Sequence, residues 1–248
     1  METWIYAIGA TLLVSVVSLV GILFLSWNTI QLKKIVFVLV SLAVGALFGD
    51  AFFHLIPESA NLHTDPHATG ILVVVGILFF FILEKFILWR HDHSISESTK
   101  HIKPLGYISL AADGIHNLID GVLIGASFMV SPELGFSTTL AIVLHEIPQE
   151  IADFGVLTHS GFSVQKAIWL NLGTALTAVL GAALVLIIDQ RVENFVNYIV
   201  PVAAGGFIYL AGSDLIPELK KENSIKKSMM QFVCILAGLG LILLFHFE

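Results

Sequence analysis

Eight apolar stretches, each about as long as a lipid bilayer is thick, govern what this chain can fold into. A helix needs roughly 20 predominantly apolar residues to cross the hydrocarbon core of a membrane. The stretches cover residues 4–26, 35–57, 69–89, 105–130, 136–158, 165–188, 195–218 and 228–247. Because the bilayer core offers no partners for backbone hydrogen bonds, segments of this length cross as helices. We therefore predict an all-α polytopic membrane protein with eight transmembrane helices.

The composition agrees with this class and excludes several others. Only 12% of the 248 residues are charged, whereas about 25% is usual in soluble domains. The net charge of −7 and the small number of basic residues argue against nucleic acid as a partner. Cys234 is the single cysteine, which excludes an intrachain disulfide and a thiolate metal cage. The first apolar stretch is too long for a signal peptide, so we expect a retained helix.

Basic residues set the expected orientation in the membrane, since loops rich in Lys and Arg face the cytoplasm. Eleven of the twelve basic residues lie in or beside the loops that follow spans one, three, five and seven. The exception is Arg191, which belongs to the alternate set of loops. We therefore expect those four loops in the cytoplasm and both termini outside.

An internal repeat appears when the sequence is shifted by 160 positions. His54-Leu-Ile-Pro-Glu58 then meets Asp214-Leu-Ile-Pro-Glu218, and Gly45 meets Gly205. The two copies run in opposite directions through the membrane, which is the arrangement of inverted repeats in transporters. The alternative is a helix-end string that occurs twice by chance. The repeat predicts a 3+2+3 layout in one transporter domain, residues 1–248. Residues 1–90 form helices one to three, 91–104 a cytoplasmic loop, 105–158 central helices four and five, and 165–248 helices six to eight.

Ionisable and amide side chains are concentrated near the midpoints of the two central spans. They are costly at that depth and mark functional sites by default. His116 and Asp120 are four residues apart and share a helix face, as do His145 and Gln149. Asn117 and Glu146 lie beside these pairs, and Asp113, Glu150 and Asp153 extend the polar stripe by about one turn. Pro148 is expected to kink the fifth span beside these side chains.

Imidazole and carboxylate groups together favour zinc, iron(II), manganese or cadmium. We therefore expect a divalent-metal site between the two central spans, with a proton relay that binds no metal as the alternative. A lone His–Asp pair on a helix is usually a structural hydrogen bond, but seven or more polar groups on two neighbouring helices favour a metal. Asp113, Glu150 and Asp153 are either pathway residues or helix-packing partners.

The strings His116-Asn117-Leu-Ile-Asp120-Gly121 and His145-Glu146-Ile-Pro-Gln149-Glu150 resemble the fourth and fifth helices of the ZIP (Zrt/Irt-like) metal transporters. The resemblance is to the branch whose fifth helix reads His-Glu-x-Pro-His-Glu, and it extends over most of the chain. It implies eight helices, outside termini, a homodimer and a binuclear site between helices four and five.

The resemblance also assigns individual residues. His116, Asp120, His145 and Gln149 would hold the main ion, and Asn117, Asp120, Glu146 and Gln149 a second one. His54 matches a position that approaches the main site from outside. Gln149 departs from the family's His or Glu, and the sixth span has no acid before Asp189. Both departures weaken the expected second position.

Two loops contain further candidate ligands. His91, Asp92, His93 and His101 lie in the loop after span three, and Asn61, His63, Asp65 and His67 lie in the loop after span two. We interpret both groups as solvated loop residues, with weak metal capture as the alternative.

These observations predict a transporter that moves a divalent metal into the cytosol, with rocking of the outer helices against the central pair. Zinc is the expected substrate, iron(II), manganese and cadmium are alternatives, and no resident cofactor is expected. The rival function is an intramembrane zinc metalloprotease, because His145-Glu146 resembles the start of His-Glu-x-x-His. Gln149 removes the second imidazole of that motif, so we expect no enzyme. Small size and short loops favour the plasma membrane of a bacterium, with an organelle membrane as the alternative.

Overall fold

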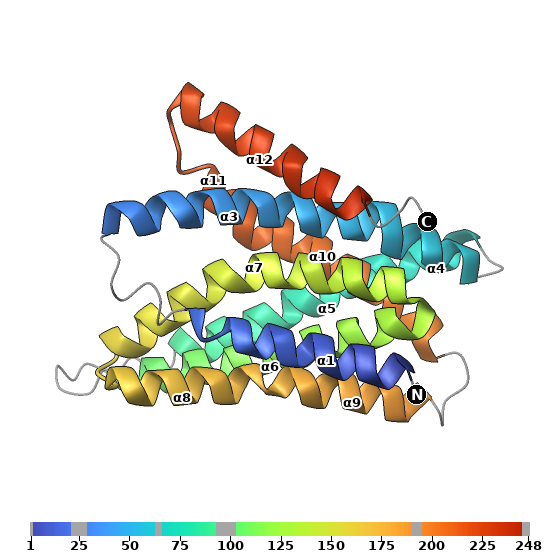
Figure 1. The fold of residues 1–248 in the computed structure, drawn as a ribbon, viewed down its shortest axis with the longest axis horizontal. Helices are drawn as coiled ribbons and strands as arrows, with labels where there is room; N and C mark the ends of the chain where they lie inside the picture. The colour runs from blue at the N-terminus through green and yellow to red at the C-terminus, as the bar shows by residue number, and fades with distance from the viewer. Residues whose placement is uncertain (1, 21–28, 63–65, 93–102, 190–194, 245–248) are drawn as a thin grey trace.

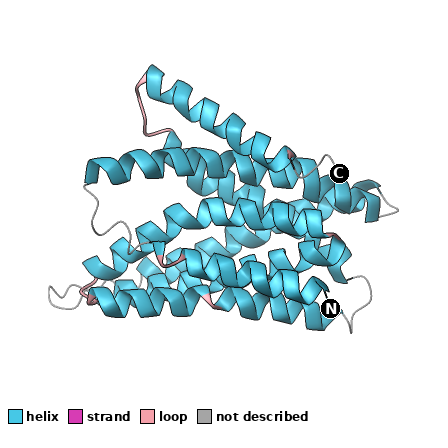
Figure 2. Ribbon diagram, in the orientation of Figure 1, coloured by secondary structure: helices cyan, strands magenta, loops and turns pink. Residues whose placement is uncertain are grey.

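The computed structural model describes residues 2–20, 29–62, 66–92, 103–189 and 195–244, and their regular structure is helical (Figures 1 and 2). The helices run back and forth along one long axis. In chain order they are α1 (Glu2–Val17), α3 (Thr29–Gly49), η1 (Asp50–Leu55), α4 (Ile56–Leu62), α5 (Pro66–Asp92), α6 (Lys103–Val130), α7 (Pro132–His159), α8 (Val164–Ala175), α9 (Thr177–Asp189), α10 (Phe195–Leu210), η2 (Ala211–Leu215), α11 (Ile216–Leu219) and α12 (Ile225–Leu243).

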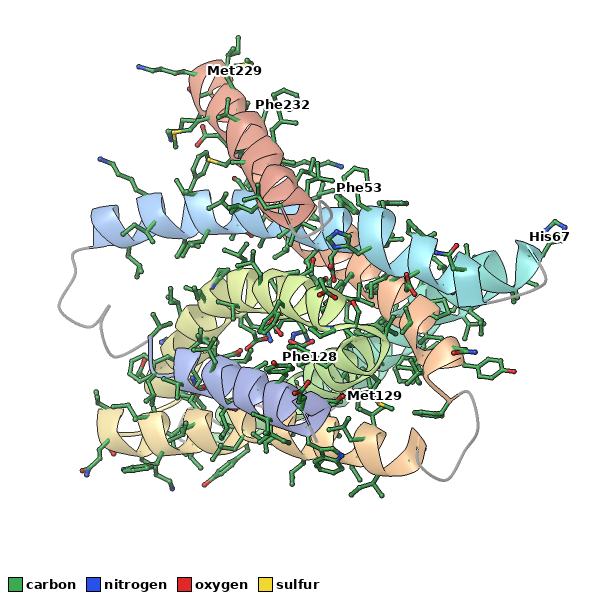
Figure 3. All side chains as sticks on the ribbon, turned by 45° about the vertical axis from the view of Figure 1, so that its right-hand side comes forward. Phe53, His67, Phe128, Met129, Met229 and Phe232 are labelled. Atoms are coloured by element: carbon green, nitrogen blue, oxygen red, sulfur yellow. The ribbon has the colours of Figure 1, made fainter. Side chains whose placement is uncertain are left out.

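Five helical stretches among the described residues are long and apolar enough to cross a membrane, which confirms a polytopic membrane protein. They are Lys34–Asn61, His67–Lys85, Val164–Ile188, Phe195–Leu219 and Ile225–Leu243. The outer helices expose large apolar side chains, and Met229 and Phe232 project outward from α12 (Figure 3). A surface of this kind suits lipid rather than water. The shorter α1 and the more polar α6 and α7 are not among the five.

Both ends of the described chain lie at one end of the bundle (Figure 1). The start of α1 and the end of α12 share this end with the connection between α6 and α7. The opposite end holds the end of α5, the start of α6, the connection between α7 and α8, and the start of α12. The start of α3 and the end of α11 also lie toward this end (Figure 1). Most of the basic residues that predict the cytoplasmic side lie in or next to these segments, so we call this the basic end.

The repeated Leu-Ile-Pro-Glu string follows a π-helical turn in both copies. The turn η1 ends at Leu55 and the turn η2 ends at Leu215, 160 positions later. The helices α3 and α10 that carry the turns run in opposite directions along the bundle (Figure 1). Because π-helical turns are rare in helices, their occurrence at equivalent positions supports an inverted repeat over chance similarity.

Glycines bring three pairs of helices into close contact. The crossings are Gly45 of α3 with Gly238 of α12, Gly76 of α5 with Gly205 of α10, and Gly121 of α6 with Gly181 of α9. A Cβ atom at any of the six would come within 2.2 Å of a backbone oxygen on the partner helix. Small residues at helix crossings are typical of membrane proteins, where close packing stabilises association.

The sixth predicted span, 165–188, is not one uninterrupted helix but the pair α8 and α9, divided at Leu176. Side-chain hydroxyls donate to carbonyls just before the division: Ser15 Oγ to the Ala175 oxygen at 2.8 Å, and Thr177 Oγ1 to the Thr174 oxygen at 2.6 Å. Side chains that compete for helix carbonyls bend or break a helix. By contrast, α7 continues from Pro132 to His159 through Pro148.

The other boundaries differ by a few residues. The helix α1 ends at Val17, and the end of the predicted first span, residues 21–26, lies outside the described residues. The second span begins earlier and continues through η1 and α4 to Leu62.

Candidate metal centre

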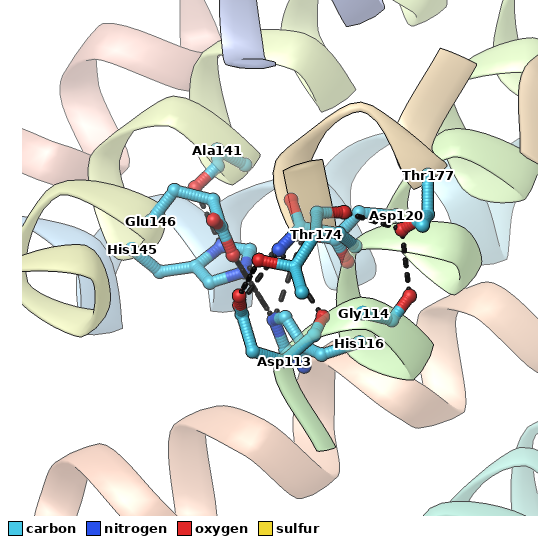
Figure 4. A network of polar contacts seen from close by, with 10 residues as sticks. Asp113, Gly114, His116, Asp120, Ala141, His145, Glu146, Thr174 and Thr177 are labelled. Carbon is cyan, nitrogen blue, oxygen red and sulfur yellow. Dashed lines mark hydrogen bonds and ion pairs between the residues drawn. The ribbon is translucent and has the colours of Figure 1, made fainter. Parts of the chain in front are cut away.

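Four ligand atoms from α6 and α7 converge in the middle of the bundle (Figure 4). They come from His116, Asp120, His145 and Glu146, and all lie within 4.8 Å of one another. His116 Nε2 is 3.2 Å from Glu146 Oε1 and 3.6 Å from Asp120 Oδ2. His145 Nε2 is 3.3 Å from Asp120 Oδ2 and 3.7 Å from Glu146 Oε1. The two Nε2 atoms are 3.3 Å apart.

These separations suit a tetrahedral ion. Zinc binds histidine nitrogen and carboxylate oxygen at about 2.0–2.1 Å, so neighbouring ligand atoms in a tetrahedron are roughly 3.3 Å apart. The five measured separations, 3.2–3.7 Å, lie close to that length. Two neutral imidazoles and two carboxylates also balance the charge of a divalent cation in a medium of low dielectric constant.

The helices determine which atoms face the centre. His116 and Asp120 are one turn apart on α6, whereas His145 and Glu146 are neighbours on α7. His145 Nδ1 lies 3.1 Å from the Ala141 carbonyl oxygen one turn back. Since that oxygen can only accept, Nδ1 carries the proton, and Nε2 is left with a lone pair for a ligand.

The other two candidate ligands lie at the edge of this cluster. Asn117 is fully buried, and its Nδ2 donates to Asp113 Oδ1 at 2.8 Å. Gln149 lines a cavity of about 310 Å³ that also reaches His116. Four of the six candidate ligands, the two histidines and the two acids, therefore form one compact set, and Glu146 belongs to it.

The cavity runs from His116 toward the basic end. Its lining includes Asp113 on α6 and Asp153 on α7, two of the four candidate pathway residues. Two carboxylates that sequence reasoning missed, Glu84 of α5 and Asp214 of η2, complete its acidic lining. The repeat aligns Asp214 with His54, which was a signal for Asp214 that sequence reasoning left unused, whereas Glu84 is a lone acid next to Lys85.

The other two pathway candidates lie away from this cavity. Glu150 is buried and accepts a hydrogen bond from Asn171 Nδ2 of α8. His54 lies on η1, on the side of the cluster away from the basic end, with its Nδ1 2.7 Å from Ser137 Oγ and 3.2 Å from Asp50 Oδ1. Asp50 also accepts from Thr138 Oγ1 at 2.8 Å. The spacing of Asp50 and His54, one turn apart, was a signal that sequence reasoning left unused.

The candidate loop ligands are only partly described. His63, Asp65, His93 and His101 lie outside the described residues, as do the side chains of His91 and Asp92. Asn61 and His67 are exposed at opposite sides of the undescribed residues 63–65.

Comparison with known proteins decides the family. A family model described as ZIP zinc transporter matches residues 1–103 and 89–246. The chain belongs to the ZIP family. Zinc transporter ZIP13 of Pongo abelii is 35% identical over 84% of this chain and 66% of its own length. Zinc transporter SLC39A7 of Mus musculus is 30% identical over 99% of this chain and 70% of its own length. Zinc transporter zipt-7.1 of Caenorhabditis briggsae is 30% identical over 97% of this chain and 78% of its own length.

Membership in the ZIP family confirms a membrane metal transporter and no enzyme. The protease alternative gains no support. This ZIP chain spans about two thirds of the ZIP13 relative. The relatives named above are animal proteins, so they give no support to the expectation of a bacterial membrane.

Proposed function

We propose that this ZIP protein carries a divalent metal ion, with zinc as the expected substrate, across its membrane into the cytosol. The observation that carries the proposal is the four-atom set of His116, Asp120, His145 and Glu146, whose separations suit a tetrahedral ion. Iron(II), manganese and cadmium are alternative substrates, because the same donors bind them. Asn117 and Gln149, beside this set, would contribute to a second ion position.

The membrane arrangement that goes with this function has eight transmembrane helices in one domain with a 3+2+3 inverted layout. The matched π-helical turns support the repeat. So do the crossings, since Gly45 of α3 faces α12 and its equivalent Gly205 of α10 faces α5. Under the repeat, helix two corresponds to helix seven, and helix eight corresponds to helix three. The crossing of helices two and eight is therefore equivalent to the crossing of helices seven and three. The polar helices α6 and α7 would then cross the membrane surrounded by the others.

The side on which the cluster is open supports the proposed direction. The cavity beside His116 leads toward the basic end, which the positive-inside rule assigns to the cytoplasm. On the other side, fully buried side chains fill the space, among them Leu47, Ile124, Ile142 and Phe207. The Phe207 ring lies 6.4 Å from the His145 ring. This arrangement fits a transporter closed to the outside and open to the cytoplasm, with both termini outside.

The transport steps follow from the same residues. A metal ion would arrive from outside past His54 and Asp50, lose its water, and bind the four donors. It would then pass to the carboxylates Asp113 and Asp153, which line the cavity with Glu84 and Asp214. Acidic groups along an exit favour a cation at each step without holding it as tightly as the four converging donors do.

The packing indicates which helices would move together. The helices α1, α6, α7, α8 and α9 pack on one another, while α3 packs on α12 and α5 on α10. All three glycine crossings lie inside these groups, and the groups meet where α3 packs on α7 and α10 on α6. We therefore propose that α1 and α6–α9 move together, carrying the metal, relative to the other helices. This motion takes the place of a rocking of all outer helices against α6 and α7 alone.

The resemblance extends the proposal to a homodimer, and the small size and short loops extend it to a plasma membrane. Cross-linking in intact cells and membrane fractionation test these two points independently of transport.

Reconstitution in liposomes tests the function. The purified protein is sealed in vesicles that hold a metal-sensitive dye, and zinc, cadmium, manganese and iron(II) are added outside. We expect zinc uptake that His116→Ala abolishes. His159→Ala is the matched control, because His159 is an exposed histidine at the end of the same helix as His145. Absence of flux for all four metals with folded protein contradicts the proposal.

A further inference from the structure

The helix α8, which carries no acidic residue, contributes a hydroxyl group beside the candidate metal centre. Thr174 Oγ1 donates a hydrogen bond to Asp113 Oδ2 at 2.5 Å (Figure 4). Asp113 Oδ1, the other oxygen of the same carboxylate, accepts from Asn117 Nδ2 at 2.8 Å. The three side chains therefore form a chain of hydrogen bonds that begins on α8 and ends at Asn117 on α6.

Chemistry fixes which way the Asn117 amide faces. Its nitrogen lies 2.8 Å from Asp113 Oδ1 and 3.2 Å from the Asp113 backbone oxygen. Both atoms only accept hydrogen bonds when the carboxylate is ionised, so the NH₂ group must face them. The reversed amide would set its oxygen against two other oxygens.

The amide oxygen of Asn117 is thereby directed away from Asp113. Asn117 has 0% exposure, and no described residue donates a hydrogen bond to its Oδ1. A buried polar atom without a partner costs free energy unless something else binds it. A cation is a partner that such an oxygen accepts, and Asn117 lies between His116 and Asp120, one turn of α6 that supplies two of the four metal donors.

From these contacts we propose that Thr174 is a positioning residue, which acts through Asp113 to present the Asn117 amide oxygen to a metal ion at the second position proposed above. The inference rests on the proposed function. Hydrogen bonds that orient metal ligands typically change metal affinity by about 10- to 100-fold when they are removed. The role requires the Thr174 hydroxyl and not the shape of the side chain.

The chain also offers a matched control three residues away. Thr177 Oγ1 lies 2.6 Å from the backbone oxygen of Gly114 and 2.6 Å from that of Thr174, so its proton can be donated to either, and neither of these hydrogen bonds involves the Asp113 carboxylate. Thr174→Val and Thr177→Val thus each remove a hydroxyl group next to the break between α8 and α9. Only the first removes a hydrogen bond from the chain that ends at Asn117.

The experiment measures zinc affinity of the purified protein by competition with a chelating dye. We expect Thr174→Val to weaken zinc binding by about 10-fold or more. Thr174→Ser, which keeps the hydroxyl, should restore the parent affinity, and Thr177→Val should stay within about twofold of it. Equal losses in Thr174→Val and Thr177→Val, or no recovery in Thr174→Ser, overturn the positioning role.

Metal preference provides a readout that a general folding defect does not change. The amide oxygen is a hard ligand, so its loss should weaken manganese more than cadmium. We expect the ratio of manganese to cadmium affinity to fall in Thr174→Val. An unchanged ratio overturns the inference.

A double-mutant cycle tests whether Thr174 acts through Asp113. In an Asp113→Asn background, where one side-chain oxygen cannot accept from both partners, adding Thr174→Val should have little further effect. Additive losses overturn the inference. If Thr174→Val does not fold, Asp113→Asn alone must show the same weakened zinc binding and the same shift in metal preference. Parent protein without zinc flux contradicts the proposed function, whereas normal parent flux with unchanged Thr174→Val affinity contradicts only the positioning role.

Discussion

His116 and His145 face each other through their Nε2 atoms, 3.3 Å apart, with the two rings nearly perpendicular at 87°. At this distance one Nε2 can donate a hydrogen bond to the other, since a neutral imidazole has a proton on one nitrogen and a lone pair on the other. A cation between the two atoms takes the place of that proton and bonds to both nitrogens. The two helices are thus held in a geometry that favours an ion, and that geometry leads to the following expectations.

Glu146 should matter more for zinc binding than Gln149. Glu146 Oε1 lies 3.2 Å from His116 Nε2 inside the compact set, whereas Gln149 lines the neighbouring cavity. We expect Glu146→Gln to weaken zinc affinity by about 10- to 100-fold, because it removes a charged ligand. Gln149→Ala should weaken zinc affinity by a smaller factor. The two dissociation constants, measured by dye competition, decide the point, and a larger loss in Gln149→Ala contradicts the four-atom site.

Zinc affinity should fall as the pH is lowered. Zinc binds neutral histidine and ionised carboxylate, so each proton that a ligand takes up must be released on binding. The apparent affinity should therefore decline steadily as the medium becomes more acidic. Calorimetry in two buffers of different ionisation enthalpy measures the proton release, and equal heats in both buffers would argue against these ligands.

Filling the exit cavity should separate transport from binding. Ala112 of α6 lines the cavity that leads from His116 to the basic end. We expect Ala112→Trp to reduce zinc flux severalfold and to leave zinc affinity nearly unchanged, because the indole occupies the route but not the donors. Ala111→Trp is the control, since Ala111 is exposed and does not line the cavity. Parent-like flux in Ala112→Trp would contradict this exit route.

The glycine crossing between α6 and α9 should limit stability. A Cβ at Gly121 would lie 1.8 Å from the Ala178 backbone oxygen, so Gly121→Ala forces the helices apart. Overpacking of this kind typically costs about 1–3 kcal/mol. A Cβ at Gly173 of α8 meets nothing within 4 Å, so Gly173→Ala serves as the control. Thermal unfolding in detergent should show a lower midpoint for Gly121→Ala alone.

Labelling of single cysteines tests the orientation. Cys234 is the only native cysteine, so Cys234→Ala gives a background without thiols. Glu2→Cys, at the exposed start of α1, should react with an impermeant reagent from outside the cell. Lys221→Cys, exposed at the basic end, should react only after the membrane is opened. The reverse pattern would invert the direction of transport proposed above.

Much of the fold could be predicted because the length of each apolar stretch by itself indicates a membrane-spanning helix. The division of the sixth span at Leu176 was missed, because it depends on Ser15 of a distant helix donating to the Ala175 oxygen. No local sequence pattern near Leu176 predicts such a contact. The end of α1 at Val17, within the predicted first span, was also missed, because apolar composition does not mark where a helix stops.

The candidate site was predicted to the level of helix faces and not of individual atoms. Spacing placed His116 and Asp120 on one face of α6, and the structure brings them together with His145. Whether Glu146 or Gln149 of α7 points into the same space depends on how far α7 is rotated about its axis, and that is set by packing. Thr174 and Asn171 gave no signal, since uncharged polar residues are common in membrane helices.

The π-helical turns η1 and η2 each contain one residue more than an ordinary helical turn would. One additional residue rotates everything beyond it by about 100° around the helix axis. In each of the two long segments, the residues before the turn and the residues after it therefore present different helix faces to the neighbouring helices, as they would after the insertion of one residue. Loss of one residue from η1 alone would turn Leu-Ile-Pro-Glu58 to a new side and leave its counterpart at Glu218 in place. The two halves can stay alike only if both keep the insertion.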